Sequence, residues 1–223
     1  VTKAKNEQLR ANLLRSISHD LRTPLTSISG NVAILLNNEE AFDKEKRRQL
    51  YTGIYDDSMW LINLVENLLS VTRLEESSMR LNMQVELVDE VIEEALKHIS
   101  RKREEHQLVY EPSEELLLAK MDSRLIVQVL INLVENAIKY TQEGSRIEIS
   151  AVQKGDMIQI SVADNGKGIK EDAKEKIFDM FYTAENKPAD SRRGLGLGLL
   201  LAKSIIHAHG GIIWVTDNVP SGT

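Results

Sequence analysis

Residues 16–25 have the sequence Ser16-Ile17-Ser18-His19-Asp20-Leu21-Arg22-Thr23-Pro24-Leu25. Apolar side chains recur every seven positions along and beyond this run, at Leu14, Leu21, Ile28 and Leu35, which is the spacing of a coiled-coil seam. At about 100° per residue, His19 and Thr23 lie away from this seam and one turn apart. Pro24 cannot bond the carbonyl of Asp20, so we expect a kink beside the histidine. The run predicts a helix with an exposed, reactive histidine; a solvated surface histidine is the alternative.

A second helical segment is expected over residues 43–75, where Ile54, Leu61 and Leu68 are again seven residues apart. The intervening Asn37-Asn38-Glu39-Glu40 is typical of a turn. Two long helices with a short connection form an antiparallel hairpin. A hairpin alone is too shallow to bury both apolar seams. We therefore expect two copies to pair as a dimeric four-helix bundle, which makes the protein a homodimer.

The composition is that of an ordinary globular protein, with 42% hydrophobic and 28% charged residues. The absence of cysteine excludes disulfides, thiolate metal sites and a cysteine nucleophile. A net charge of −6 argues against nucleic acid as a partner. The longest apolar stretch, Leu125–Val134, is too short to span a bilayer. Because the chain opens at Val1 without a signal peptide, we expect a cytoplasmic piece of a longer protein, attached to a membrane only through segments outside this sequence.

After Ser77 the long helical periods give way to short alternating runs that are typical of strands. Strands are expected at Met79–Val85, Gln107–Tyr110, Leu116–Met121, Arg146–Gln153, Met157–Ala163 and Ile212–Thr216. Helices are expected at Val88–Arg103, Ser123–Tyr140 and Leu197–Ala208. Lys154-Gly155-Asp156 indicates a hairpin turn. We therefore expect a helical domain over residues 1–77 and an α+β domain over residues 78–223, with helices covering one face of a sheet.

The helix expected over residues 123–140 carries Asn132, Asn136 and Lys139 at positions i, i+4 and i+7, which form one polar stripe. Amide oxygens suit a magnesium ion that keeps several waters and is shared with phosphates. A lysine one turn further on supplies a positive charge for those phosphates. The stripe indicates a metal and phosphate site, and a solvated helix face is the alternative.

Two more motifs lie between the helix expected over residues 123–140 and the last expected helix. Asp164-Asn165-Gly166-Lys167-Gly168 comes directly after a strand. Its carboxylate can accept a hydrogen bond from an exocyclic amine such as that of adenine, and its glycines let the backbone approach the ring. An ordinary turn is the alternative. Ile177–Tyr182 is an aromatic cluster in a chain with only three Phe, and core packing is its alternative.

A glycine-rich run, Gly194-Leu195-Gly196-Leu197-Gly198, precedes the last expected helix. Bare amides at a helix N-terminus favour phosphate binding, and a flexible loop is the alternative. The polar stretch Thr183–Arg193 before it is expected to form a mobile lid over a nucleotide, with Arg192 and Arg193 available to phosphates. The patterns of a P-loop and of a dinucleotide-binding fold are absent from the sequence.

Taken together, these motifs resemble those of sensor histidine kinases. Residues 16–25 resemble the phospho-acceptor box of that family. Residues 132–140, 164–169, 177–182 and 194–199 resemble, in order and spacing, the N, G1, F and G2 boxes of an ATP-binding fold. Histidine kinases share this fold with gyrase B subunits, clamp-type heat-shock chaperones and MutL proteins. The resemblance implies a helical hairpin, dimeric as a four-helix bundle, followed by an α+β two-layer sandwich of the GHKL (Bergerat) type.

Within that family, the runs Asp56–Leu69 and Ser191–Gly194 are most similar to the Kdp-type potassium and osmotic sensor kinases. The finer resemblance implies the cytoplasmic portion of a bacterial inner-membrane sensor. It also implies a cognate response regulator as the partner of the homodimer.

The resemblance further implies roles for individual residues. His19 would accept the γ-phosphate of ATP, Asp20 would act as its general base, and Thr23 would position a water that dephosphorylates the regulator. Asn136 and Asn132 would hold Mg²⁺. The phosphoryl group would then pass from the histidine to an aspartate of the response regulator.

The same resemblance implies an ATP site. Lys139 would contact phosphate, Tyr140 would flank the base, and Asp164 would accept a hydrogen bond from the adenine amine. The other residues implied around ATP are Asn132, Asn136, Gly166, Gly168, Phe181, Arg193, Gly194, Leu195, Gly196, Leu197 and Gly198.

Two other functions stay open from the sequence. One is a non-kinase ATPase of the same GHKL type, and the histidine-bearing hairpin argues against it. The other is a dimerisation module with an inactive nucleotide domain, and the complete polar motifs argue against that.

Overall fold

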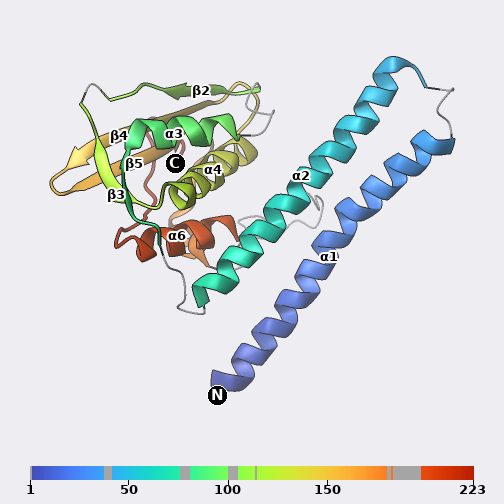
Figure 1. Ribbon diagram of the computed structural model, residues 1–223, viewed down its shortest axis with the longest axis horizontal. Helices are drawn as coiled ribbons and strands as arrows, with labels where there is room; N and C mark the ends of the chain where they lie inside the picture. Colours follow the sequence, from blue (N-terminus) through green and yellow to red (C-terminus); the bar gives the residue numbers. More distant parts are fainter. Residues whose placement is uncertain are drawn as a thin grey trace. The chain divides into compact units, whose positions relative to one another are not determined.

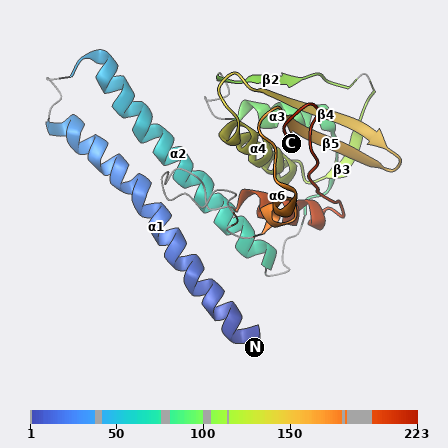
Figure 2. The same cartoon turned by 180° about the vertical axis from the view of Figure 1, so that it is seen from behind.

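The structure is a computed structural model that describes residues 2–37, 42–75, 81–99, 105–113, 115–179, 182 and 197–223. Within these ranges, the description covers the backbone but not the side chains of residues 2–17, 19, 20, 63 and 66–75. The chain forms two compact units that divide near residue 72. The first unit contains two long helices, and the second contains the strands and the shorter helices (Figures 1 and 2). The domain division at residues 77 and 78 stays a prediction, because residues 76–80 lie outside the described part.

The first unit is the predicted helical hairpin. Helix α1 (Thr2–Asn37) and helix α2 (Lys44–Glu75) run antiparallel, side by side (Figures 1 and 2). Asp43 Oδ1 accepts a hydrogen bond from Lys46 N at 2.7 Å, an N-cap that satisfies a free amide in the first turn of α2. Helix α1 continues through Pro24 as one helix, so the proline does not divide it. Across the described residues, no helix is both long and apolar enough to cross a membrane.

The second unit contains a three-stranded sheet in the order β2-β4-β5. Strand β2 (Gln107–Tyr110) lies parallel to β4 (Arg146–Lys154), which pairs antiparallel with β5 (Met157–Asp164). A two-residue loop joins β4 to β5, and its Gly155 has a φ of +61°, a left-handed conformation that suits glycine. The predicted hairpin is confirmed.

Strands β1 (Gln84–Leu87) and β3 (Leu118–Met121) form a separate antiparallel pair, so the predicted single sheet is two sheets. Ile212–Thr216 is not a strand, which corrects the sequence prediction. Exposure does alternate along this segment as in a strand: Ile212 and Trp214 are 73% and 54% exposed, whereas Ile213 and Val215 are half-buried. A strand also needs a hydrogen-bonded neighbour, and no strand of the described part pairs with this segment.

The helices of the second unit are α3 (Val88–Lys97), α4 (Ser123–Tyr140), the single turn α5 (Glu171–Lys174), the 3-10 turn η2 (Lys176–Phe178) and α6 (Gly198–Ala208). Helix α4 packs against α3 and α6 and against strands β4 and β5. Figure 1 shows α3 and α4 together on one face of the three-stranded sheet. The most deeply buried side chains come from both layers: Val88, Ile92, Val134, Ile147, Leu201 and Ile205. The predicted α+β arrangement with helices on one face of a sheet is confirmed.

A polar contact ties the two layers together at the edge of the sheet. The Tyr110 hydroxyl on β2 donates a hydrogen bond to Asp89 Oδ1 on α3. Burial raises the pKa of the Tyr110 hydroxyl, and the contact with Asp89 raises it further. The hydroxyl therefore remains a donor throughout the neutral range.

The first unit leaves many large apolar side chains exposed. They lie on both helices: Leu25, Val32, Ile34, Leu36, Tyr51, Tyr55, Met59, Ile62 and Val65. Exposed apolar surface of this extent is characteristic of a protein interface. This supports the predicted pairing of two copies.

We predict that the chain is a dimer at tens of micromolar and that Leu25→Glu shifts it toward monomer. Leu25 is 51% exposed and lies about 40° around the helix from Leu21 of the heptad seam, so dimer formation would bury a carboxylate there at a cost of several kcal/mol. Sedimentation velocity measures the change. Thr26→Glu adds the same charge about 100° around the helix and is expected to leave the dimer intact. A wild-type chain that sediments only as monomer contradicts the prediction.

Candidate functional site

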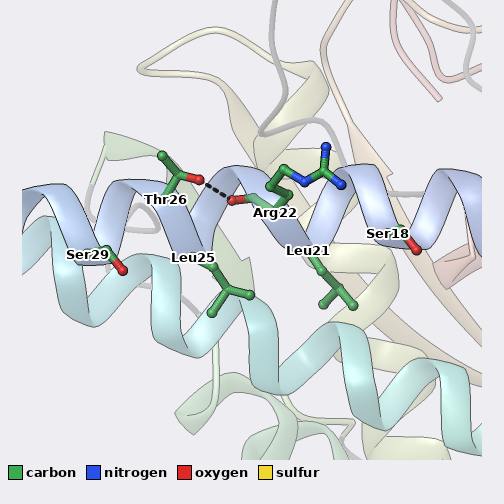
Figure 3. A pocket seen from close by; sticks show the side chains of 6 residues that line it. All are labelled: Ser18, Leu21, Arg22, Leu25, Thr26 and Ser29. Carbon is green, nitrogen blue, oxygen red and sulfur yellow. Dashed lines mark hydrogen bonds between the residues drawn. The ribbon is translucent and has the colours of Figure 1, made fainter.

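The histidine-bearing run lies in the middle of α1. The backbone of His19 and Asp20 is helical, but their side chains lie outside those that the structure describes. Thr23 follows one turn later and is half-buried. A shallow pocket along this stretch is lined by Ser18, Leu21, Arg22, Leu25, Thr26 and Ser29 (Figure 3).

The side chains around this pocket separate by polarity. Leu21 and Leu25 point toward α2, whereas Arg22 and Thr26 point away from it (Figure 3). Thr26 Oγ1 donates a hydrogen bond to the Arg22 carbonyl at 2.8 Å. The stretch is therefore amphipathic in the way that the heptad spacing predicts, with its apolar side toward the second helix.

Helix α4 positions the polar stripe by burying its opposite face. The buried residues of α4 are Ile126, Val129, Leu130, Val134, Ala137 and Ile138. Asn132 and Asn136 are half-buried at the edge of this face, and Asn132 Nδ2 donates a hydrogen bond to the Gly198 carbonyl at 3.3 Å. Lys139 and Tyr140 are exposed at the end of the helix, with the lysine Nζ 4.9 Å from the centroid of the tyrosine ring. This end of the stripe is open to a ligand.

Asp164 ends β5, and its carboxylate is oriented by the turn that follows. Asp164 Oδ1 accepts a hydrogen bond from Gly166 N at 2.8 Å. A Cβ on Gly166 would lie 2.8 Å from Thr141 Cγ2 and 2.9 Å from Asp164 Oδ1. A Cβ on Gly168, where φ is +71°, would lie 3.1 Å from the Gly222 carbonyl oxygen. Close packing therefore favours glycine at both positions, and at Gly168 the left-handed backbone conformation favours it as well.

The last residues of the chain also surround Asp164, which the sequence motifs did not indicate. Asp164 N donates a hydrogen bond to the Thr223 carbonyl at 2.8 Å, and Asn218 Nδ2 donates one to the Asp164 carbonyl at 2.8 Å. Gly222 is buried directly against that carbonyl, with no room for a Cβ. Thr141 was also missed, although it directly follows Tyr140. Alternation in residues 212–216 predicts a strand there, but it carries no information on the contacts that residues 218–223 make with Asp164.

Part of the glycine-rich run is described. Leu197 is 3% exposed and belongs to the core, so only its backbone could face a ligand. Gly198 begins α6 and lies against Asn132, since a Cβ there would be 3.5 Å from Asn132 Cγ. Phe181, Arg193, Gly194, Leu195 and Gly196 lie outside the described residues. Ile177 and Phe178 are buried, so core packing accounts for these two members of the aromatic cluster.

The structure thus brings three of the four motifs together around α4. Asn132 contacts the start of α6 at Gly198, and Thr141, the residue after the helix, packs against Gly166. The amides of Asn132 and Asn136, the ammonium of Lys139 and the carboxylate of Asp164 therefore belong to one region of the second unit. This is a set of groups that can recognise phosphates and a polar heterocycle.

Two family models match the chain. Residues 9–77 match the "His Kinase A (phospho-acceptor) domain". Residues 121–223 match the "Histidine kinase-, DNA gyrase B-, and HSP90-like ATPase". The first match contains His19, and the second contains the four motifs of the second unit.

Two similar curated proteins carry the same name. The chain is 46% identical over 218 residues to "Sensor protein KdpD" of Clostridium acetobutylicum, covering 98% of this chain and 24% of that protein. It is 34% identical over 219 residues to "Sensor protein KdpD" of Escherichia coli, with the same coverage. The chain spans about a quarter of the length of these relatives.

Solved structures show the same likeness. The catalytic domain of histidine kinase ThkA is 32% identical, with a TM-score of 0.56, and the match covers 63% of this chain and 91% of that one. ThkA in complex with the response regulator protein TrrA has a TM-score of 0.64 at 27% identity, covering 98% and 61%. Full-length ShkA in complex with AMPPNP has a TM-score of 0.65 at 25% identity, covering 95% and 44%.

We predict that Gly166→Ala destabilises the second unit by about 1–3 kcal/mol, as overpacking in a tight site does. The new methyl would meet Thr141 Cγ2 and Asp164 Oδ1 below van der Waals distance. Thermal unfolding followed by circular dichroism measures the effect. Gly30→Ala is the control, because a Cβ at that helical glycine has no neighbour within 4 Å. An unchanged melting temperature for Gly166→Ala would show that the contact is not tight.

Proposed function

We propose that this chain, which belongs to the sensor histidine kinase family, is the kinase core of a two-component sensor. It phosphorylates itself on His19 with ATP and passes the phosphoryl group to an aspartate of a response regulator. The observation that carries the proposal is the presence of both kinase parts, in order, in one chain. A histidine-bearing helical hairpin precedes an α+β unit with the motifs of an ATP site.

In the proposed reaction, a ring nitrogen of His19 attacks the γ-phosphorus of ATP. The bond between that phosphorus and the β–γ bridging oxygen breaks, and ADP leaves with the bond electrons. Imidazole is a fair nucleophile here because much of it is unprotonated near neutral pH. Asp20 accepts a hydrogen bond from the other ring nitrogen and raises the basicity of the attacking one.

The ATP site is proposed around α4 and the end of β5. Asp164 accepts a hydrogen bond from the adenine amine, and its bond from Gly166 N leaves the second carboxylate oxygen to do so. Lys139 contacts phosphate, and Tyr140 flanks the base. Gly168, Phe181, Arg193 and the run from Gly194 to Gly198 complete the site. The AMPPNP complex of ShkA supports nucleotide binding by this fold.

Mg²⁺ is proposed to bind at Asn136 and Asn132. Both are half-buried and one turn apart on α4, and their neutral amide oxygens fit an ion that shares its ligands with water and phosphate. When bound, the ion would offset the negative charge of the phosphates.

The comparisons suggest the setting of this kinase core. The two KdpD relatives support a Kdp-type sensor, attached to a bacterial inner membrane through segments outside this sequence and facing the cytoplasm. The ThkA–TrrA complex supports a response regulator as partner. The exposed apolar side chains of α1 and α2 support a homodimer.

We predict that incubation with Mg²⁺ and γ-labelled ATP transfers label to this chain and that His19→Gln abolishes it. The labelled wild-type protein should lose its label in acid and keep it in alkali, because the bond formed is a phosphoramidate. Label persisting in the variant would mean that His19 is not the acceptor. Nucleotide binding without any label would favour a non-kinase ATPase or an inactive module.

We also predict that Thr23→Ala keeps autophosphorylation but weakens dephosphorylation of the phosphorylated regulator. The proposed role of Thr23, one turn after His19, is to position the attacking water, which the forward reaction does not use. The two rates are measured separately on the same preparation. Loss of both to the same extent contradicts this division of roles.

A further inference from the structure

The backbone of Asp164 is held from both sides by the end of the chain. Its N–H donates to the Thr223 carbonyl, and its carbonyl accepts from Asn218 Nδ2, each at 2.8 Å. Because both peptide groups of Asp164 are fixed, the direction of its side chain depends only on rotation within the side chain. Gly166 N then fixes that rotation through its bond to Oδ1.

Asn218 is the residue on which this arrangement depends. Its Oδ1 accepts a hydrogen bond from Val219 N at 2.9 Å, and its own N–H donates to the Gly222 carbonyl at 3.1 Å. The bond to Gly222 closes the loop over residues 218–222, and the bond from Val219 N fixes the Asn218 side chain within it. The third bond, from Nδ2, attaches that closed loop to Asp164. Asn218 is half-buried, and the neighbouring Asp217 is anchored separately by Lys174 Nζ at 2.7 Å.

We propose that Asn218 is a positioning residue for base recognition: through its bond to the Asp164 carbonyl, it holds the carboxylate in the orientation that selects a nucleotide with an exocyclic amine. This inference rests on the proposed role of Asp164 in reading adenine. Asn218 itself does not contact the nucleotide. Its effect is on the choice between bases, because only a correctly directed carboxylate oxygen distinguishes an amine from a carbonyl.

The test compares the binding of ATP and inosine triphosphate, which has a carbonyl in place of the adenine amine, to the whole chain by calorimetry. The wild-type chain is expected to prefer ATP, and Asp164→Ala to remove the preference. Asn218→Asp keeps the acceptor for Val219 N but loses the donor to Asp164, and it is expected to lower the ATP preference about fivefold, as loss of one hydrogen bond does. Ser221→Ala is the matched loop control, because its hydroxyl bonds the Asn165 carbonyl and not Asp164.

Each outcome decides the matter. A reduced preference in Asn218→Asp, with Ser221→Ala like wild type, supports the proposal. Equal weakening of both nucleotides would show a merely structural role and overturn it, as would an unchanged preference. If Asn218→Asp unfolds, Asn218→Ala, which also lacks the Nδ2 donor to Asp164, is measured in its place by the same criterion. If Asp164→Ala keeps the wild-type preference, the role of Asp164 itself fails, and the inference falls with it.

Discussion

The burial of one face of α4 is the constraint on which the second unit depends. Val134 and Ala137 must lie inward for the helix layer to pack on the sheet, and this fixes the direction of the intervening Asn136. The same rotation places Asn132 against Gly198. Apolar packing, which has no directionality of its own, therefore determines where the polar groups of the site are presented.

The features that could be predicted from the sequence are those that depend on the spacing of residues close together in the chain. The helix expected along the heptads of α1, the amphipathic period of α4 and the turn at Gly155 each depend on residues close together in the chain, and all three elements are confirmed. The pairing of Asn218 with Asp164 was not predicted, because it joins residues 54 apart and no local pattern records it. For the segment from Ile212 to Thr216 a strand was predicted where none forms. Alternation indicates that a strand would have two different faces, but it does not show whether a neighbouring strand is available to pair with it.

In the site motifs too, local sequence explains only part of what each residue does. Gly166 was selected as a glycine that lets the backbone approach a ring, and its contact with Thr141 shows a second reason for it. Thr141 has no special chemistry, so only its place in the fold reveals its part in the site. Leu197 lies inside a recognisable motif, and burial shows that its side chain serves the core. A sequence motif therefore locates the region of a site more reliably than it assigns a role to each residue in that region.

The parallel pairing of β2 with β4 has a consequence for how this protein is made. Gln107 pairs with Arg146, about 40 residues later, whereas β4 and β5 are adjacent in the chain. At a synthesis rate of about 5–20 residues per second, β2 leaves the ribosome about 2–8 s before its neighbour. During that interval its backbone groups have no sheet to join, although α3 is already complete. The hydrogen bond between Tyr110 on β2 and Asp89 on α3 joins two segments that both precede β4 in the chain, so this contact can form before the hairpin arrives.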